Sequence, residues 1–195
     1  MAKLESTLTN MLLSLGGIAL VASALLGFAY QATKGPIAEA NQKILENAIK
    51  IVSPADLKES KLGDMYMLPG GKDSLACYPV LDASGKLVVT AISTYTDEGF
   101  SGRFKIMVGF APDGTIVNTA VLSHSETPGL GDKMDKSKSD WSNQFNGKNP
   151  ESYKLTVTKD GGDVDAITAA TISSRAFCDA TDRAYTAYMK GGHHE

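Results

Sequence analysis

Small and hydroxyl side chains are concentrated where a short apolar segment runs into an expected helix. The stretch reads Asp-Ala-Ile-Thr-Ala-Ala-Thr-Ile-Ser-Ser-Arg over residues 165–175. A helix N-terminus presents free backbone N–H groups and a partial positive charge, so a phosphate group binds well there. Thr171 places a hydroxyl at or just before the first turn, where a phosphate would lie, and an ester bond to this hydroxyl would fix the phosphate permanently. The alternative is that Thr and Ser at this position only cap the helix.

Four neighbouring side chains also have two readings each. Ser173 and Ser174 are either donors to the phosphate or ordinary residues of a first helical turn. Arg175 either pairs with the phosphate charge or lies on a solvated helix face. Asp165 either orients the loop before the helix or is simply a turn residue at the end of a strand.

A second candidate region is a loop of Gly and Pro residues. It reads Ser-Glu-Thr-Pro-Gly-Leu-Gly-Asp over residues 125–132, and a similar loop, Glu-Gly-Phe-Ser-Gly-Arg, covers residues 98–103. Glycines permit close backbone approach, and Pro128 stiffens the loop. Such loops are either plain turns or, together with a phosphate site, the means to hold a flat cofactor.

The N-terminal part of the chain is apolar enough to interact with a membrane. No charged residue occurs between residues 6 and 33, and the most apolar stretch covers residues 11–30. Twenty helical residues span about 30 Å, the thickness of the hydrocarbon core of a bilayer. We expect a retained membrane anchor over residues 1–34. A cleaved signal peptide is the alternative, although no small-x-small cleavage site follows the apolar run.

The remaining residues, about 160 in number, suit one globular domain. The net charge of −3 and the lack of a basic stripe argue against nucleic-acid binding. Cys77 and Cys178 form no CxxC, haem-attachment or zinc pattern. They are either two small buried side chains or a disulfide.

The periodicity of apolar residues predicts an α+β fold with a largely antiparallel sheet and packed helices. Gly35 and Pro36 are expected to end or kink the anchor helix. An amphipathic helix and a loop are expected over residues 35–74, and the main domain over residues 75–195. Helical spacing places the last helix at about residues 172–190. Strands are expected at residues 75–81, 86–94, 103–111, 115–124, 153–158 and 163–167.

Together these stretches resemble the FMN-binding domain family. The chain is most similar to the G subunits of Rnf electron-transport complexes and, more distantly, to the C subunits of sodium-pumping NADH:quinone reductases. The resemblance rests on the anchor, residues 99–102, 105–110, 123–131, 141, 144–145 and 165–174. The family's modification motif, Asp-x-x-Ser/Thr-Gly/Ala-Ala-Thr, is matched here by Asp165, Thr168, Ala169, Ala170 and Thr171.

The resemblance implies a covalent flavin. FMN is attached in this family through its phosphate to the threonine that corresponds to Thr171, by a separate flavin transferase that uses FAD and Mg²⁺. Position 169 is commonly Gly in the family and is Ala here. The family also places one loop beside the flavin ring, formed here by Glu126, Thr127, Gly129, Leu130 and Gly131. Trp141 either contacts the ring or packs in the core.

The resemblance also implies a role in electron transfer without a substrate of the chain's own. The flavin domain is expected on the periplasmic side of the inner membrane, and the partners are the membrane and iron–sulfur subunits of an Rnf complex that couples ferredoxin–NAD⁺ electron transfer to ion movement. Two alternatives remain at this point. One is the C subunit of a sodium-translocating NADH:quinone reductase, and the other is a membrane-tethered module that binds a soluble phosphate ligand without a redox role.

Overall fold

The computed structural model describes residues 7–54 and 60–191. The first residues of the expected anchor, part of the expected loop at residues 55–59, and the C-terminal residues 192–195 lie outside the described residues. The chain divides into two units, Met1–Ile44 and Leu45–Glu195. The second unit contains every strand and the C-terminal helix of the described part of the chain.

Helix α1, Leu8–Val52, is long and apolar enough to cross a membrane once. The mean hydropathy of its most apolar 18-residue window is 2.2, and none of that window is buried within the protein. Of the two alternatives expected for Gly35 and Pro36, that they end this helix is wrong, because Pro36 lies inside α1. Proline removes one backbone hydrogen bond and disturbs the preceding turn, but the residues on both sides still favour a helix.

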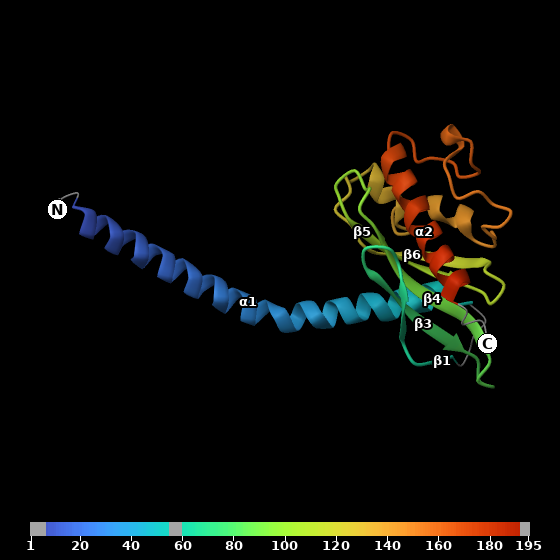
Figure 1. Ribbon diagram of the computed structural model, residues 1–195, viewed down its shortest axis with the longest axis horizontal. Coiled ribbons are helices and arrows are strands. Elements are labelled where there is room, and N and C mark those ends of the chain that lie inside the picture. The colour runs from blue at the N-terminus through green and yellow to red at the C-terminus, as the bar shows by residue number, and fades with distance from the viewer. Residues whose placement is uncertain (1–6, 55–59, 192–195) are drawn as a thin grey trace. The chain divides into compact units, whose positions relative to one another are not determined.

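The second unit is built on a six-stranded antiparallel sheet. Its main path has the order β1-β3-β4-β5-β6, and β2 also pairs with β3 (Figure 1). From β3 onward each strand pairs with the next strand along the chain, so the turn between two strands helps to specify their register. The strands are β1, Lys61–Leu62; β2, Tyr66–Pro69; β3, Ser74–Leu81; β4, Leu87–Thr96; β5, Phe104–Phe110; and β6, Ile116–Ser123.

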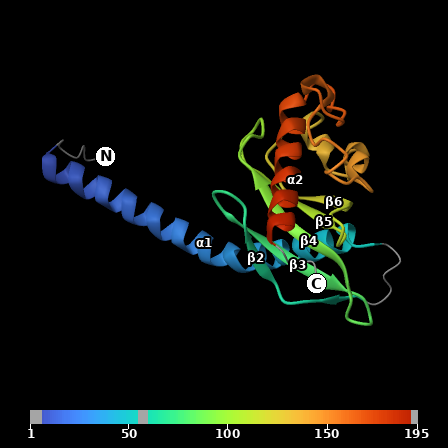
Figure 2. The ribbon, with the colours of Figure 1, turned by 45° about the vertical axis from the view of Figure 1, so that its right-hand side comes forward.

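Both faces of the sheet are covered, and each side of β5 faces a different helix. Helix α2, Thr171–Gly191, lies across one face (Figures 1 and 2). The alternate residues Phe104, Ile106, Val108 and Phe110 belong to the core on this face, as expected from their spacing. Met107 belongs to a second core on the other face, where the last turn of α1 packs through Ala48, Ile49 and Val52. The sheet is therefore a rigid central layer between two apolar contacts.

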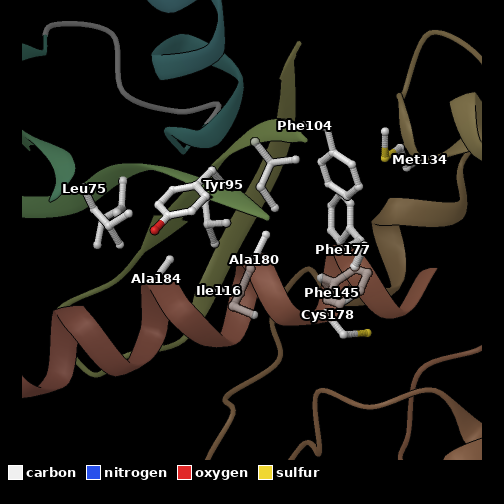
Figure 3. Close-up of a cluster of buried hydrophobic side chains, with 14 of the residues drawn as sticks. Leu75, Tyr95, Phe104, Ile116, Met134, Phe145, Phe177, Cys178, Ala180 and Ala184 are labelled. Atoms are coloured by element: carbon white, nitrogen blue, oxygen red, sulfur yellow. The ribbon is translucent and has the colours of Figure 1, made fainter. Parts of the chain in front are cut away.

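The larger core is richest in aromatic residues near the start of α2. Phe104, Phe145 and Phe177 gather there beside Met134, while Ala180 and Ala184 bring the next turns of α2 close to the sheet (Figure 3). The small alanine side chains permit this approach, which the buried hydrogen bond from Thr94 Oγ1 to the carbonyl oxygen of Ala180, 2.9 Å long, reinforces. The N-terminal part of α2 is thus packed into the larger core.

Two expectations about strands are wrong. Residues 60–74, expected to form a loop, contain β1 and β2, which both pair with β3. Residues 153–158 and 163–167, expected as strands, form only an isolated parallel bridge, between Val157 and Val164, and no strand of the sheet. The carboxylate of Asp163 accepts a hydrogen bond from the N–H of Lys154 at 2.7 Å, so the two segments close on each other rather than on the sheet. A short helix, η3, Thr158–Asp160, lies between them.

Candidate functional site

A pocket of about 290 Å³ lies where α2 begins. Three segments that are far apart in the sequence form its walls: the loop before β5, the loop after β6, and the residues around the first turn of α2. Its lining is mainly apolar, with a few hydroxyl groups and one carboxylate. The lining residues are Phe100, Glu126, Thr127, Leu130, Gly131, Ala169, Ala170, Thr171, Ile172 and Ser173.

The start of α2 presents unused hydrogen-bonding groups to this pocket. The residue before the helix is Ala170, whose methyl group cannot cap it, and the first-turn N–H groups have no acceptor within the helix. Thr171 is half-buried and lines the pocket. Its hydroxyl receives no hydrogen bond from the residues that the structure describes. The capping alternative therefore does not account for Thr171, and a free hydroxyl stands beside free N–H donors.

The two serines that follow are already engaged. Ser174 is fully buried; its hydroxyl donates to the carbonyl oxygen of Ala170 at 3.0 Å and accepts from the N–H of Ile167 at 2.9 Å. Ser173 is also buried, and its hydroxyl donates to Glu126 Oε2 at 2.7 Å. Ser174 thus stabilises the turn that leads into α2 and does not line the pocket, whereas Ser173 does.

Glu126 connects the three walls of the pocket. It is only 5% exposed, and its two carboxylate oxygens accept hydrogen bonds from different segments. Oε2 accepts from Ser173 on α2, and Oε1 accepts from the N–H of Ser101 at 3.1 Å. Its own N–H donates to His124 Nδ1 at 3.1 Å. The carboxylate therefore holds the two loops and the helix in one arrangement.

The chain enters α2 through an unusual backbone conformation. Ala169 has a φ of 62°, the only positive φ at a residue other than glycine among the described residues. This left-handed conformation costs a residue with a Cβ atom about 1–2 kcal/mol. It turns the backbone so that Ala169, Ala170 and Thr171 all line the pocket. The conformation also gives a physical reason for glycine to suit this position.

Asp165 lies outside the pocket, and hydrogen bonds with Trp141 and Gln144 hold its backbone. Its carbonyl oxygen accepts hydrogen bonds from Trp141 Nε1 at 2.6 Å and Gln144 Nε2 at 3.2 Å, and its N–H donates to Gln144 Oε1 at 2.8 Å. Trp141 packs edge-on against Phe145 and Phe177 and does not line the pocket, so the core-packing alternative holds for this residue. The short helix η2, Trp141–Phe145, thus anchors the start of the hydroxyl-rich stretch.

Three other expected site residues lie outside the pocket. Thr168 and Gly129 are exposed neighbours of lining residues. Arg175 pairs with Asp160, with Nε 2.6 Å from Oδ2 and Nη2 2.9 Å from Oδ1. These bonds direct the guanidinium to η3, and they lower the pKa of Asp160 below its ordinary value. The solvated alternative therefore describes Arg175 better than a phosphate contact does.

Comparison with known proteins identifies the kind of domain that carries this pocket. Residues 99–186 match the FMN-binding domain family. The chain is 37% identical to the G subunit of the ion-translocating oxidoreductase complex of Aliivibrio fischeri strain ES114 over 191 residues, which cover 94% of this chain and 91% of that protein. The corresponding G subunit of Shewanella amazonensis is 35% identical over 92% of this chain and 86% of that protein.

The chain belongs to the family of G subunits of ion-translocating oxidoreductase complexes. It contains an FMN-binding domain, and the matched region includes all three walls of the pocket. The crystal structure of NqrC from Shewanella oneidensis also matches, with a TM-score of 0.48 and 25% identity over 60% of each chain.

The pocket of this family member fits a phosphate-bearing flavin chemically. The uncapped start of α2 supplies N–H donors for an anion, and the apolar lining suits an aromatic ring system. Asp132, next to the lining residue Gly131, is 7% exposed, and its Oδ1 has no hydrogen-bond partner among the described residues. A buried acceptor of this kind needs a donor from outside the described residues, which an ordered water or a ligand supplies.

Two residues that line the pocket are not among the site residues expected from the sequence. Phe100 is 65% exposed and Ile172 is 47% exposed, yet both line the pocket. Residues 99–102 belong to the stretches that carry the family resemblance, which is the available signal for Phe100. Ile172 lies in residues 165–174, which carry the same resemblance, but its spacing assigns it to the apolar seam of the last helix.

Proposed function

We propose that this chain is the subunit of a membrane-bound, ion-translocating oxidoreductase complex that carries electrons on an FMN esterified to Thr171. Membership of the G-subunit family and the FMN-binding domain support the general role. The observation that carries the proposal is the placement of the free Thr171 hydroxyl in the pocket at the uncapped start of α2. FMN supplies the redox chemistry when bound, and the chain supplies its position and surroundings.

Different residues of the pocket hold the phosphate and the ring of the cofactor. The first-turn N–H groups of α2 stabilise the phosphate, and the left-handed Ala169 keeps the backbone clear of it. Phe100, Leu130 and Ile172 supply an apolar surface for the flavin ring. Because an ester bond prevents loss of the cofactor, the ring does not need deep burial. Partial exposure of the ring suits electron exchange with a neighbouring protein of the complex.

The position of Thr171 favours it as the ester site over the other hydroxyls nearby. Thr168 is exposed and outside the pocket, and Ser174 is buried with both its donor and acceptor in use. Thr171 is the residue of this motif that combines partial exposure, a place in the pocket and a hydroxyl without a partner among the described residues.

We further propose that α1 anchors the chain in the inner membrane with the flavin domain in the periplasm. The length and hydropathy of α1 support a membrane crossing. A flavin transferase that uses FAD and Mg²⁺ makes the ester bond. The other membrane and iron–sulfur subunits of the complex supply and accept the electrons, so the isolated chain is expected to lack the overall ferredoxin–NAD⁺ activity.

Intact-mass measurement tests the ester bond. Full-length protein from its own host should carry the added mass of one FMN residue, and its band on a denaturing gel should fluoresce. Thr171→Ala should lose the flavin while its circular dichroism spectrum stays unchanged, because the Thr171 hydroxyl makes no hydrogen bond to the described residues. Thr168→Ala, the matched control outside the pocket, should keep the flavin. A wild-type protein with the mass of the bare polypeptide would refute the proposal.

A further inference from the structure

Three hydroxyl-bearing residues line the pocket, Thr127, Thr171 and Ser173, and two of them lie at the start of α2, where the fold must distinguish between them. Thr171 and Ser173 are two residues apart at the start of α2, and both contribute to the pocket wall. A phosphate that reaches this helix end therefore comes near both. The inference below rests on the proposed attachment of FMN to Thr171 and concerns what keeps the phosphate away from Ser173.

The immediate surroundings of Ser173 are dominated by a carboxylate. Glu126 Oε2 lies 2.7 Å from Ser173 Oγ and accepts its only hydroxyl hydrogen. No ion pair to Glu126 occurs in the described part of the chain, so no side-chain cation there balances this charge. A phosphate ester on Ser173 would place negative charge directly beside a buried negative charge, where the repulsion is strong.

The fold makes room for this carboxylate from two sides. A Cβ atom at Gly131 would lie 2.5 Å from Glu126 Oε2, and a Cβ atom at Gly99 would lie 2.7 Å from Oε1. Two glycines on different loops therefore let the backbone close around the same side chain. Oε1 is meanwhile fixed by the N–H of Ser101. The carboxylate is thereby held in one place, and because Coulomb repulsion falls with distance, its charge acts most strongly on the hydroxyl that it contacts, that of Ser173.

We propose that Glu126 is a positioning residue that excludes the flavin phosphate from Ser173 and so restricts attachment to Thr171. In the attachment step, the bond between the threonine oxygen and the FMN phosphorus forms, and the pyrophosphate bond between the FMN and AMP halves of FAD breaks. AMP leaves, and the hydroxyl proton passes to a base of the transferase. Glu126 takes no part in this bond exchange; it determines which hydroxyl undergoes it.

Glu126→Gln provides the sharpest test, because it removes the charge and keeps the shape. The amide oxygen can still accept from the Ser101 N–H, and the amide nitrogen can donate to Ser173 Oγ, which releases the hydroxyl hydrogen of Ser173. The full-length variant is produced with the transferase, FAD and Mg²⁺, and the flavin-bearing peptides are mapped by tandem mass spectrometry. Flavin on Ser173 should rise from below about 1% of the total to about 10% or more.

Two double variants, each compared with a single-substitution control, make this result specific. Glu126→Gln combined with Ser173→Ala should again carry flavin on Thr171 alone. Ser173→Ala by itself should also carry flavin on Thr171 alone, with a lower unfolding midpoint because it removes the bond to Glu126 Oε2. Glu126→Gln combined with Thr171→Ala should carry flavin on Ser173, whereas Thr171→Ala alone should carry none. Thermal unfolding of each variant, followed by circular dichroism, establishes that the domain is folded.

The outcomes separate this inference from the proposed function. If wild-type protein is modified at Thr171 and Glu126→Gln is modified there alone, the role of Glu126 is overturned and the ester at Thr171 stands. The same conclusion follows if folded Glu126→Gln carries no flavin, since Glu126 would then be needed for loading and not for selection. If wild-type protein is unmodified, the ester proposal fails and this inference fails with it.

Discussion

At the scale of the residue, the left-handed conformation of Ala169 has a measurable cost. Its φ of 62° brings Cβ close to the backbone, whereas glycine adopts this conformation without that penalty. We expect Ala169→Gly to raise the free energy of unfolding by about 1 kcal/mol, after allowance for the greater freedom of glycine in the unfolded chain. Denaturant unfolding of the full chain in detergent, followed by circular dichroism, measures the change.

The neighbouring alanine provides the control for this prediction. Ala170 is buried and has no positive φ, so Ala170→Gly removes a methyl group and adds unfolded-state freedom without relieving strain. It should lower the free energy of unfolding by about 0.5–1 kcal/mol. A loss of stability in both variants would show that the backbone at Ala169 is not strained.

Individual site residues are predictable from the sequence where the signal is local. Thr171, Ala169 and Ala170 follow one another in the chain, so the motif that contains them also places them in the pocket. Phe100 and Ile172 escape prediction as lining residues because their contribution depends on how distant segments meet. The hydrogen bond between Glu126 and Ser173 joins residues 47 positions apart, which no local pattern reports.

At the scale of the element, η2 supports the stretch that leads into α2. The hydrogen bond from Trp141 Nε1 to the carbonyl oxygen of Asp165 is 2.6 Å long and joins η2 to the first residue of the motif. Trp141→Phe keeps an aromatic ring against Phe145 and Phe177 but removes this donor. We expect the free energy of unfolding to fall by about 1 kcal/mol and flavin attachment to become slower. The rate of attachment is measured as the increase of flavin fluorescence in the gel band over time.

A second residue of η2 serves as the control. Asn143 bonds with Lys136 and Asp140 and makes no contact with Asp165 in the described hydrogen bonds. Asn143→Ala should therefore leave the rate of flavin attachment unchanged. Equal slowing in both variants would mean that η2 acts through its general stability and not through the bond to Asp165.

The contact between β5 and the last turn of α1 depends on the absence of a side chain. A Cβ atom at Gly109 would overlap the carbonyl oxygen of Val52 and lie 2.9 Å from its Cβ atom. Gly109→Ala should push this turn from the sheet and lower the unfolding midpoint, at a cost of about 1–3 kcal/mol. Gly35→Ala, where no atom lies within 4 Å, should not lower it. An unchanged midpoint for Gly109→Ala would contradict the tight packing.

The elements themselves are predictable to different degrees. The segments that form β3 to β6 are rich in apolar and β-branched residues, with clear alternation in β5, and are joined by turns, and the last helix has a regular apolar seam. Residues 153–158 also alternate, but Asp163 binds the backbone of Lys154 and closes the segment into a loop. β1 and β2 are too short to be recognised without β3 as their partner.

At the scale of the whole molecule, composition and periodicity are sufficient for the fold class and the apolar N-terminal helix. They are not sufficient for the two-sided core, because nothing in the sequence of residues 45–52 shows that they pack on the opposite face of the sheet from α2. The amphipathic helix expected there and the anchor are one helix, α1. The alternative of a disulfide is also resolved, since Cys77 and Cys178 are free and buried.

These two thiols report on the unfolding of the whole domain. Burial raises the pKa of Cys77 to about 12 and that of Cys178 to about 12, from an ordinary value near 9. A thiolate is the reactive form, so neither side chain should react with a thiol reagent at pH 8 while the domain is folded. Labelling of the full chain, followed by mass spectrometry, should therefore proceed at the rate of unfolding and increase steeply with denaturant.

The same pKa shifts imply a dependence of stability on pH. The unfolded chain loses its thiol protons near pH 9, but the folded domain retains them up to about pH 12. The thiol contribution to stability is therefore fully present below pH 9 and is lost as the pH rises from 9 toward 12. Replacing both cysteines with alanine should make the unfolding midpoint fall less steeply over this range, although the variant starts from a lower value because of the small cavities that it leaves. Identical slopes for the two proteins would show that the thiols are not shielded in the folded core.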